Sequence, residues 1–317
     1  MRFLLIALAV AAGPVLAQPA PERSAPERGA AFAGVSYLRT AGVLGRDNGL
    51  DTEVLTLRLG GEAHLFSRPG PTGPTAGTLG VALQAVDFSA DGFFRSGLRP
   101  QSVEVYGRVA RASGPVTRAA TAGFVLDLGP DFGSGPGDDA FPNSDRRDAV
   151  RLGVDASTEH GRDRASGGIE AIYLLPLSDL IAVSESPPTP TTETVEYTVR
   201  GGHVITVAGG ASRVFRRSVE VGLRVVGVYR TEENARSEGG CDPGGAFGLC
   251  GATPRRYVVS LVPHVRFARP ESPLSVTLAG EAPAGFFGEH TRLGVGGVGE
   301  GEPRAWLPLT LAVRVSL

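Results

Sequence analysis

Apolar and polar residues alternate along most of this chain. The clearest stretch is 54–65, where Leu55 and Leu57 share one face and Arg58 and Glu62 share the other. A period of two residues indicates a β-strand with one apolar and one polar face. The stretches with this pattern are 32–40, 52–66, 76–88, 101–112, 115–128, 147–157, 166–176, 193–213, 218–230, 256–268, 273–283 and 305–317.

The connections between these predicted strands alternate in length. Short ones, such as 113–114 and 269–272, follow long ones, such as 129–146 and 231–255. Brief periplasmic turns opposite longer outer loops are typical of bacterial outer-membrane barrels, which have an even number of antiparallel strands. We therefore expect an all-β fold, an antiparallel up-and-down transmembrane β-barrel of about 12 strands.

The charged residues determine which face of each strand points inward. An arginine that faced lipid near the bilayer midplane would cost about 2–4 kcal/mol, so the charged phase is expected to line the lumen. The lumen-lining candidates are Arg58, Glu62, His64, Glu104, Arg108, Glu196, Arg200, Glu220, Arg224, His264, Arg266, Glu281 and Arg314.

The N-terminal segment has the organisation of a secretion signal. Arg2 precedes the apolar run 3–12, which is too short to span a bilayer as a helix, and small residues near Ala17 suit a cleavage site. We expect a signal peptide at 1–17, a disordered Pro-rich tail at 18–31 and the barrel at 32–317.

Net charge and cysteine content narrow the possible functions. The formal net charge is −2, all 31 cationic side chains are arginines, and no basic stripe indicates nucleic-acid binding. Cys241 and Cys250 are the two cysteines, and in an oxidising compartment they are expected to form a disulfide. A metal site at these thiols needs two further ligands, which do not occur nearby at a familiar spacing.

No stretch predicts an enzyme or a cofactor site. Ser260 and His264 share a strand face but lie about 13 Å apart, too far for a hydrogen bond. Segment 294–299 fits G-x-G-x-x-G but lacks the flanking strand and helix of a dinucleotide site. The acidic residues near Asp138 and Asp139 do not have EF-hand spacing, so we expect a solvated loop and no metal.

The signal peptide, the alternating loop lengths and the closing sequence from Trp306 to Leu317 resemble those of bacterial outer-membrane barrels. Leu317 stands where such chains typically end in an aromatic residue. Among these proteins, the chain is similar to the roughly 12-stranded transporter-like family linked to aromatic-compound degradation. The resemblance implies localisation in the outer membrane, contact with its lipid, and insertion by the barrel-assembly machinery through the terminal strand.

The expected function is a passive, transporter-like channel for small solutes with an Arg- and Glu-lined lumen. One alternative is a closed structural or surface-interaction barrel, with loop 231–255 as the presenting element. A secreted soluble β-sandwich and a barrel enzyme are the remaining alternatives.

Overall fold

The computed structural model describes most of the strands and the connections nearest to them. The described residues are 29–41, 52–71, 73–90, 94–95, 97–128, 147–184, 192–216, 218–237, 251–253, 255–269, 272–288, 304–305 and 309–316. Among these residues, no helix is long and apolar enough to cross a membrane.

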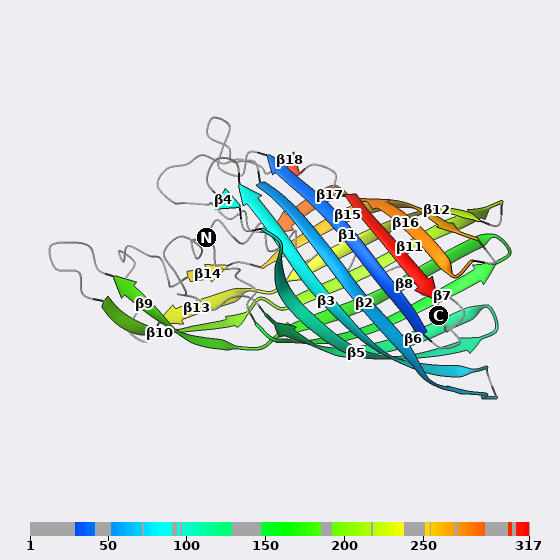
Figure 1. Cartoon of the computed structure of the whole chain (residues 1–317), viewed down its shortest axis with the longest axis horizontal. Helices are drawn as coiled ribbons and strands as arrows, with labels where there is room; N and C mark the ends of the chain where they lie inside the picture. Colours follow the sequence, from blue (N-terminus) through cyan, green and yellow to red (C-terminus); the bar gives the residue numbers. More distant parts are fainter. Residues whose placement is uncertain are drawn as a thin grey trace.

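Twelve antiparallel strands close into a barrel (Figure 1), as the sequence pattern predicts. The sheet closes because β1 pairs with both β2 and β19, while β12 pairs with both β11 and β15. The wall strands are β1 (Gly29–Ala41), β2 (Thr52–Arg68), β3 (Thr75–Ala90), β5 (Arg99–Ser113), β6 (Val116–Asp127), β7 (Ala149–His160), β8 (Asp163–Leu174), β11 (Val204–Phe215), β12 (Val219–Arg230), β15 (Arg256–Ala268), β16 (Leu274–Gly280) with its continuation β17 (Ala282–Gly288), and β19 (Leu309–Ser316).

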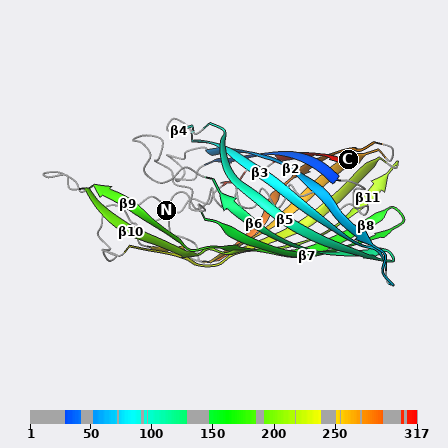
Figure 2. The ribbon, with the colours of Figure 1, turned by 60° about the horizontal axis from the view of Figure 1, so that its bottom comes forward.

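A second sheet extends beyond one end of the barrel (Figure 2). It consists of β9 (Leu177–Ser184), β10 (Thr192–Gly201), β13 (Glu233–Ser237) and β14 (Gly251–Thr253). The single strand predicted over 193–213 is therefore two strands, β10 and β11. They are separated where Gly201 and Gly202 adopt φ values of 85° and 72°, which interrupt an extended backbone. Two short strands, β4 (Phe94–Arg95) and β18 (Arg304–Ala305), pair with β3 and β1.

The two ends of the barrel differ in the length of their connections. At one end, Gly114 and Gly161 lie in tight turns between paired strands, with φ values of 58° and 62°. Both values lie in the left-handed region that favours glycine. The long connections and the second sheet lie at the other end. This arrangement matches short periplasmic turns and long outer loops.

The outer face of the wall is apolar. Leu223 is 48 % exposed and Leu311 is 46 % exposed, although both lie in the middle of their strands. Tyr257 and Phe267, at the two ends of β15, are also exposed, as expected of aromatic residues at the two membrane interfaces. A soluble protein rarely exposes such a continuous apolar surface, so hydrocarbon is the environment that fits it.

The inner face combines buried polar residues with a small apolar cluster. Thr206 and Ser260 are almost fully buried, and charged side chains such as Arg58 and Arg151 are buried as well. Val204, Val226 and Val262 form the centre of the apolar cluster, on β11, β12 and β15. Packing of these side chains joins β11, β12 and β15 on the inner face of the wall.

Candidate functional site: the charged inner wall

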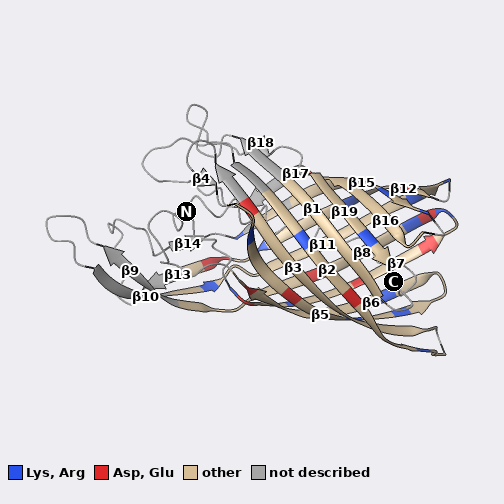
Figure 3. Ribbon diagram, viewed as in Figure 1, with Lys and Arg blue, Asp and Glu red and all other residues tan. Residues whose placement is uncertain are grey.

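Charged residues occur on many strands of the barrel wall (Figure 3). Several of them, such as Arg58, Glu104 and Glu220, belong to the strand phase opposite the exposed leucines and valines and are buried. These residues form several groups of ion pairs, each of which connects side chains from different strands.

The largest group is centred on Glu104 of β5. The Arg58 Nη2 atom donates to Glu104 Oε2 at 2.7 Å, and Arg151 donates to the other Glu104 oxygen. Arg151 also pairs with Glu170. This group therefore joins β2, β5, β7 and β8, and both arginines are buried with their carboxylate partners.

A second group is centred on Glu62 of β2. Its Oε1 accepts from the Tyr106 hydroxyl at 2.8 Å, and its Oε2 accepts from Arg314 Nη2 at 2.8 Å. Nearby, Arg108 Nη2 donates to Asp155 Oδ2 at 3.0 Å. Arg314 lies on β19 and Glu62 on β2. The Glu62 group therefore crosses β1, the first strand, where the barrel closes against the last strand.

A third group surrounds Glu220 of β12. Arg164 Nη1 donates to Glu220 Oε2 at 2.7 Å, and Arg266 Nη1 lies 3.9 Å from the same oxygen. Ser212 donates to the second oxygen of this carboxylate, and Arg164 also lies 3.8 Å from Glu159. Glu220 thus accepts hydrogen bonds from β8 and β11 and forms a longer ion pair with β15.

The ion pairs of these three groups run around the wall. Within the described chain, each of them joins strands that are neighbours or have one strand between them. Strand tilt and stagger bring such side chains together on the concave inner face. The pairs therefore link the inner wall along its circumference.

A further cluster lies where the second sheet joins the barrel. Glu233 Oε2 accepts from Arg147 at 2.8 Å and from Arg230 at 2.9 Å, and all three side chains are almost fully buried. A Cβ atom on Gly202 would lie 2.5 Å from Glu233 and 2.9 Å from Arg147. Glycine at this position therefore makes room for the cluster.

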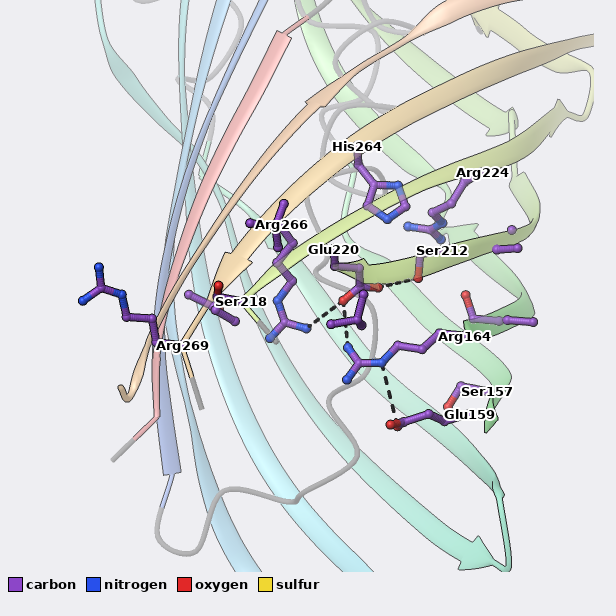
Figure 4. A pocket seen from close by; sticks show the side chains of 18 of the residues that line it. Ser157, Glu159, Arg164, Ser212, Ser218, Glu220, Arg224, His264, Arg266 and Arg269 are labelled. Atoms are coloured by element: carbon purple, nitrogen blue, oxygen red, sulfur yellow. Dashed lines mark hydrogen bonds and ion pairs between the residues drawn. The ribbon is translucent and has the colours of Figure 1, made fainter. Parts of the chain in front are cut away.

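A cavity of about 520 Å³ lies inside the short-turn end of the barrel (Figure 4). Arg164, Glu220, Arg224, His264 and Arg266 line it, together with seven serines. It is the described region where the inner wall combines several cations with free space, so it is the best candidate for contact with a solute.

Several predicted lumen residues belong to these groups, and others lie apart. Arg58, Glu62, Glu104, Arg108, Glu220, Arg266 and Arg314 form the ion pairs described above, while Arg224 and His264 line the cavity.

His64 is half-buried, and its Nδ1 atom has no hydrogen-bond partner among the described residues. Glu281 hydrogen-bonds Ser260 at the break between β16 and β17. Glu196 and Arg200 lie in β10, which belongs to the second sheet, and the Arg200 side chain is exposed.

The sequence patterns did not single out five members of the three ion-pair groups, namely Arg151, Asp155, Glu159, Arg164 and Glu170, or the cluster of Arg147, Arg230 and Glu233. The first five lie on β7 and β8, where glycine, alanine and serine weaken the apolar alternation. The signal that was present is the period-two spacing of Arg151 and Asp155 with Gly153 between them.

Other predicted features fall outside the described residues. They are the signal peptide, most of the N-terminal tail, the loop around Asp138 and the disulfide between Cys241 and Cys250. These remain predictions from the sequence.

Comparison with known proteins identifies similar folds. No family model matches the sequence, and a search of curated proteins found no significant match. The structure is similar to an outer-membrane channel of the COG4313 group from Pseudomonas putida F1, with a TM-score of 0.59, 10 % identity, and coverage of 94 % of this chain and 99 % of that one.

It is also similar to a mutant of TodX, a monoaromatic hydrocarbon channel, with a TM-score of 0.52 and 9 % identity over 92 % of this chain and 91 % of that one. At these identities the likeness concerns the fold. Together with the apolar outer face and the sorted loops, it identifies the chain as a bacterial outer-membrane β-barrel with weak similarity to the 12-stranded channels of this group.

Proposed function

We propose that this protein is a passive channel for small solutes and that its ion-paired arginines and carboxylates line the conducting lumen. The observation that carries the proposal is the circumferential course of the ion pairs, which join strands at most two positions apart. Such pairs stiffen the wall, and those of the described residues do not cross the axis of the barrel.

Barrel dimensions support this interpretation. Twelve strands tilted by about 40° enclose a backbone diameter of roughly 25 Å, wider than one arginine–carboxylate pair can bridge. Fixed charges of both signs along a narrow path would select solutes by size and charge. The proposal requires no catalytic group and no cofactor.

Single-channel recording in planar bilayers tests the proposal directly. Full-length protein, folded in detergent and verified by heat-modifiable migration on a gel, is added to the bilayer in potassium chloride. Steady current steps at constant voltage are expected. Electrical silence of the verified, folded protein would contradict the channel and favour a closed structural barrel.

The names of the similar structures indicate the size of the solutes that such channels take. TodX is named for monoaromatic hydrocarbons, and the COG4313 protein is named as a channel. We propose for this chain only solutes of similar size, and not their apolar character, because its inner wall is strongly charged.

We also propose that β19, which closes the barrel against β1 and β16, presents the insertion signal to the assembly machinery.

The second sheet favours one additional role. β9, β10, β13 and β14 project beyond the barrel at the outer end (Figure 1), which suits contact with a partner at the cell surface. Replacing residues 177–200 with a short Gly-Ser linker tests this role. Conductance is expected to persist, while a surface interaction that depends on the sheet would be lost.

A further inference from the structure

Four arginines line the cavity at the short-turn end. Arg164 and Arg266 face Glu220, and Arg269 is exposed. Arg224 is half-buried and forms no ion pair within the described chain (Figure 4). Its Nε atom is buried and has no hydrogen-bond partner there. A buried guanidinium nitrogen without a partner is costly unless an anion or ordered water satisfies it.

The neighbouring strands offer Arg224 no carboxylate. In the register of the sheet it stands opposite Gly210 on β11 and Val262 on β15. Glu220 lies four residues earlier on the same strand face, about 13 Å away between Cα atoms, and its two oxygens already accept from Arg164 and Ser212. The positive charge of Arg224 is therefore directed toward the cavity.

Two glycines create the space in which this side chain lies. A Cβ atom on Gly210 would meet Arg224 Cγ at 2.6 Å. A Cβ atom on Gly222 would meet His264 Cε1 at 2.4 Å and Ser212 Cβ at 2.6 Å. The wall is thus hollowed under Arg224 and His264, and larger residues at either glycine would displace them.

The rest of the lining contains hydroxyl groups and one further carboxylate. Seven serines line the cavity, of which Ser212 and Ser218 already donate to Glu220 and to a backbone carbonyl, and Glu159 lies beside Arg164. A guanidinium together with the remaining hydroxyl donors matches the planar or tetrahedral oxygens of a carboxylate or a phosphate. A volume of about 520 Å³ accommodates either group with a small organic substituent.

We propose that this cavity binds small oxyanions, carboxylate or phosphate, through Arg224, and makes the channel prefer anions at its periplasmic mouth. The binding site stands independently, while the anion preference rests on the proposed channel function. The two oxyanions share the same chemistry, so separate titrations must distinguish them.

Isothermal titration of the full-length protein in detergent tests the site, with inorganic phosphate and benzoate as separate ligands. Arg224→Gln is expected to weaken binding of the preferred anion about 10- to 100-fold, the effect of losing one charge-assisted hydrogen bond. Arg224→Lys keeps the charge and should retain most of the binding. Arg213→Gln is the matched control, because Arg213 lies on the outer face with its side chain 62 % exposed and pairs with Asp163.

The results of the titrations and of the bilayer recordings distinguish the anion site from the channel function. Binding that is lost in Arg224→Gln and kept in Arg213→Gln supports the site even if bilayers stay silent, in which case the channel proposal fails alone. Absence of binding for both anions, or equal binding by Arg224→Gln, overturns the site. In conducting samples, the reversal potential in a salt gradient should show an anion preference that Arg224→Gln reduces, and an unchanged potential contradicts the selectivity.

Discussion

Replacing Glu104 with glutamine is expected to destabilise the barrel strongly. Glu104 is 8 % exposed and is the shared acceptor of Arg58 and Arg151. The substitution keeps the shape of the side chain but removes the negative charge, so two buried guanidinium groups lose their common partner.

The magnitude follows from the geometry. At an effective dielectric constant near 20, one pair with charges about 4 Å apart has an attraction of about 4 kcal/mol. Glu104 has two such partners, while the amide oxygen still accepts one hydrogen bond and Arg151 retains Glu170. We therefore expect a loss of about 3–5 kcal/mol, the range for breaking a buried pair by removing one partner.

The assay is urea-dependent unfolding in lipid vesicles, followed by gel migration and tryptophan fluorescence. Asp163→Asn is the control, because the Asp163–Arg213 pair is 64 % and 62 % exposed and should contribute less than about 1 kcal/mol. If Glu104→Gln changes the free energy of unfolding by no more than this control, the ion pairs of the inner wall do not stabilise the barrel.

Two further pairs of substitutions test the outer and inner faces with the same unfolding assay. Leu223→Arg, on the outer face of β12 at mid-strand, should cost about 2–4 kcal/mol, while Phe215→Arg near the short-turn end of β11 should cost about 0–1 kcal/mol. Equal costs would contradict a position of Leu223 deeper in the membrane than Phe215. Gly222→Ala should cost about 1–3 kcal/mol because its Cβ would overlap His264 and Ser212, whereas Gly227→Ala, whose Cβ meets nothing closer than 3.8 Å, should be nearly neutral.

Much of the fold was predictable because a membrane barrel repeats one simple pattern. Each wall strand needs an apolar outer face, so alternation locates the strands, and the loop lengths give their up-and-down order. The second sheet was not predicted, because alternation continues from β10 into β11 without a change of period. The length of the predicted strand 193–213, about twice what a membrane crossing needs, and the glycine pair at 201–202 were the available signals.

For the charged residues, the sequence predicted only the strand face on which each one lies. The pattern places Arg58 and Glu104 on the polar face of their strands, but their contact depends on the stagger between β2 and β5, which are separated by β3. Stagger is a property of the whole closed sheet. Partners of this kind, and the lack of an ion pair for Arg224 among the described residues, therefore require the three-dimensional structure.

A nitroxide label at position 223 reports whether hydrocarbon covers the outer face of the barrel, as a membrane barrel requires. The label is attached to Leu223→Cys in lipid bilayers, with Cys241 and Cys250 replaced by serine. Relaxation of the label by oxygen is expected to exceed relaxation by a water-soluble nickel chelate, because oxygen concentrates in hydrocarbon. A label that responds mainly to the nickel chelate would show that water covers this face and would contradict the membrane barrel.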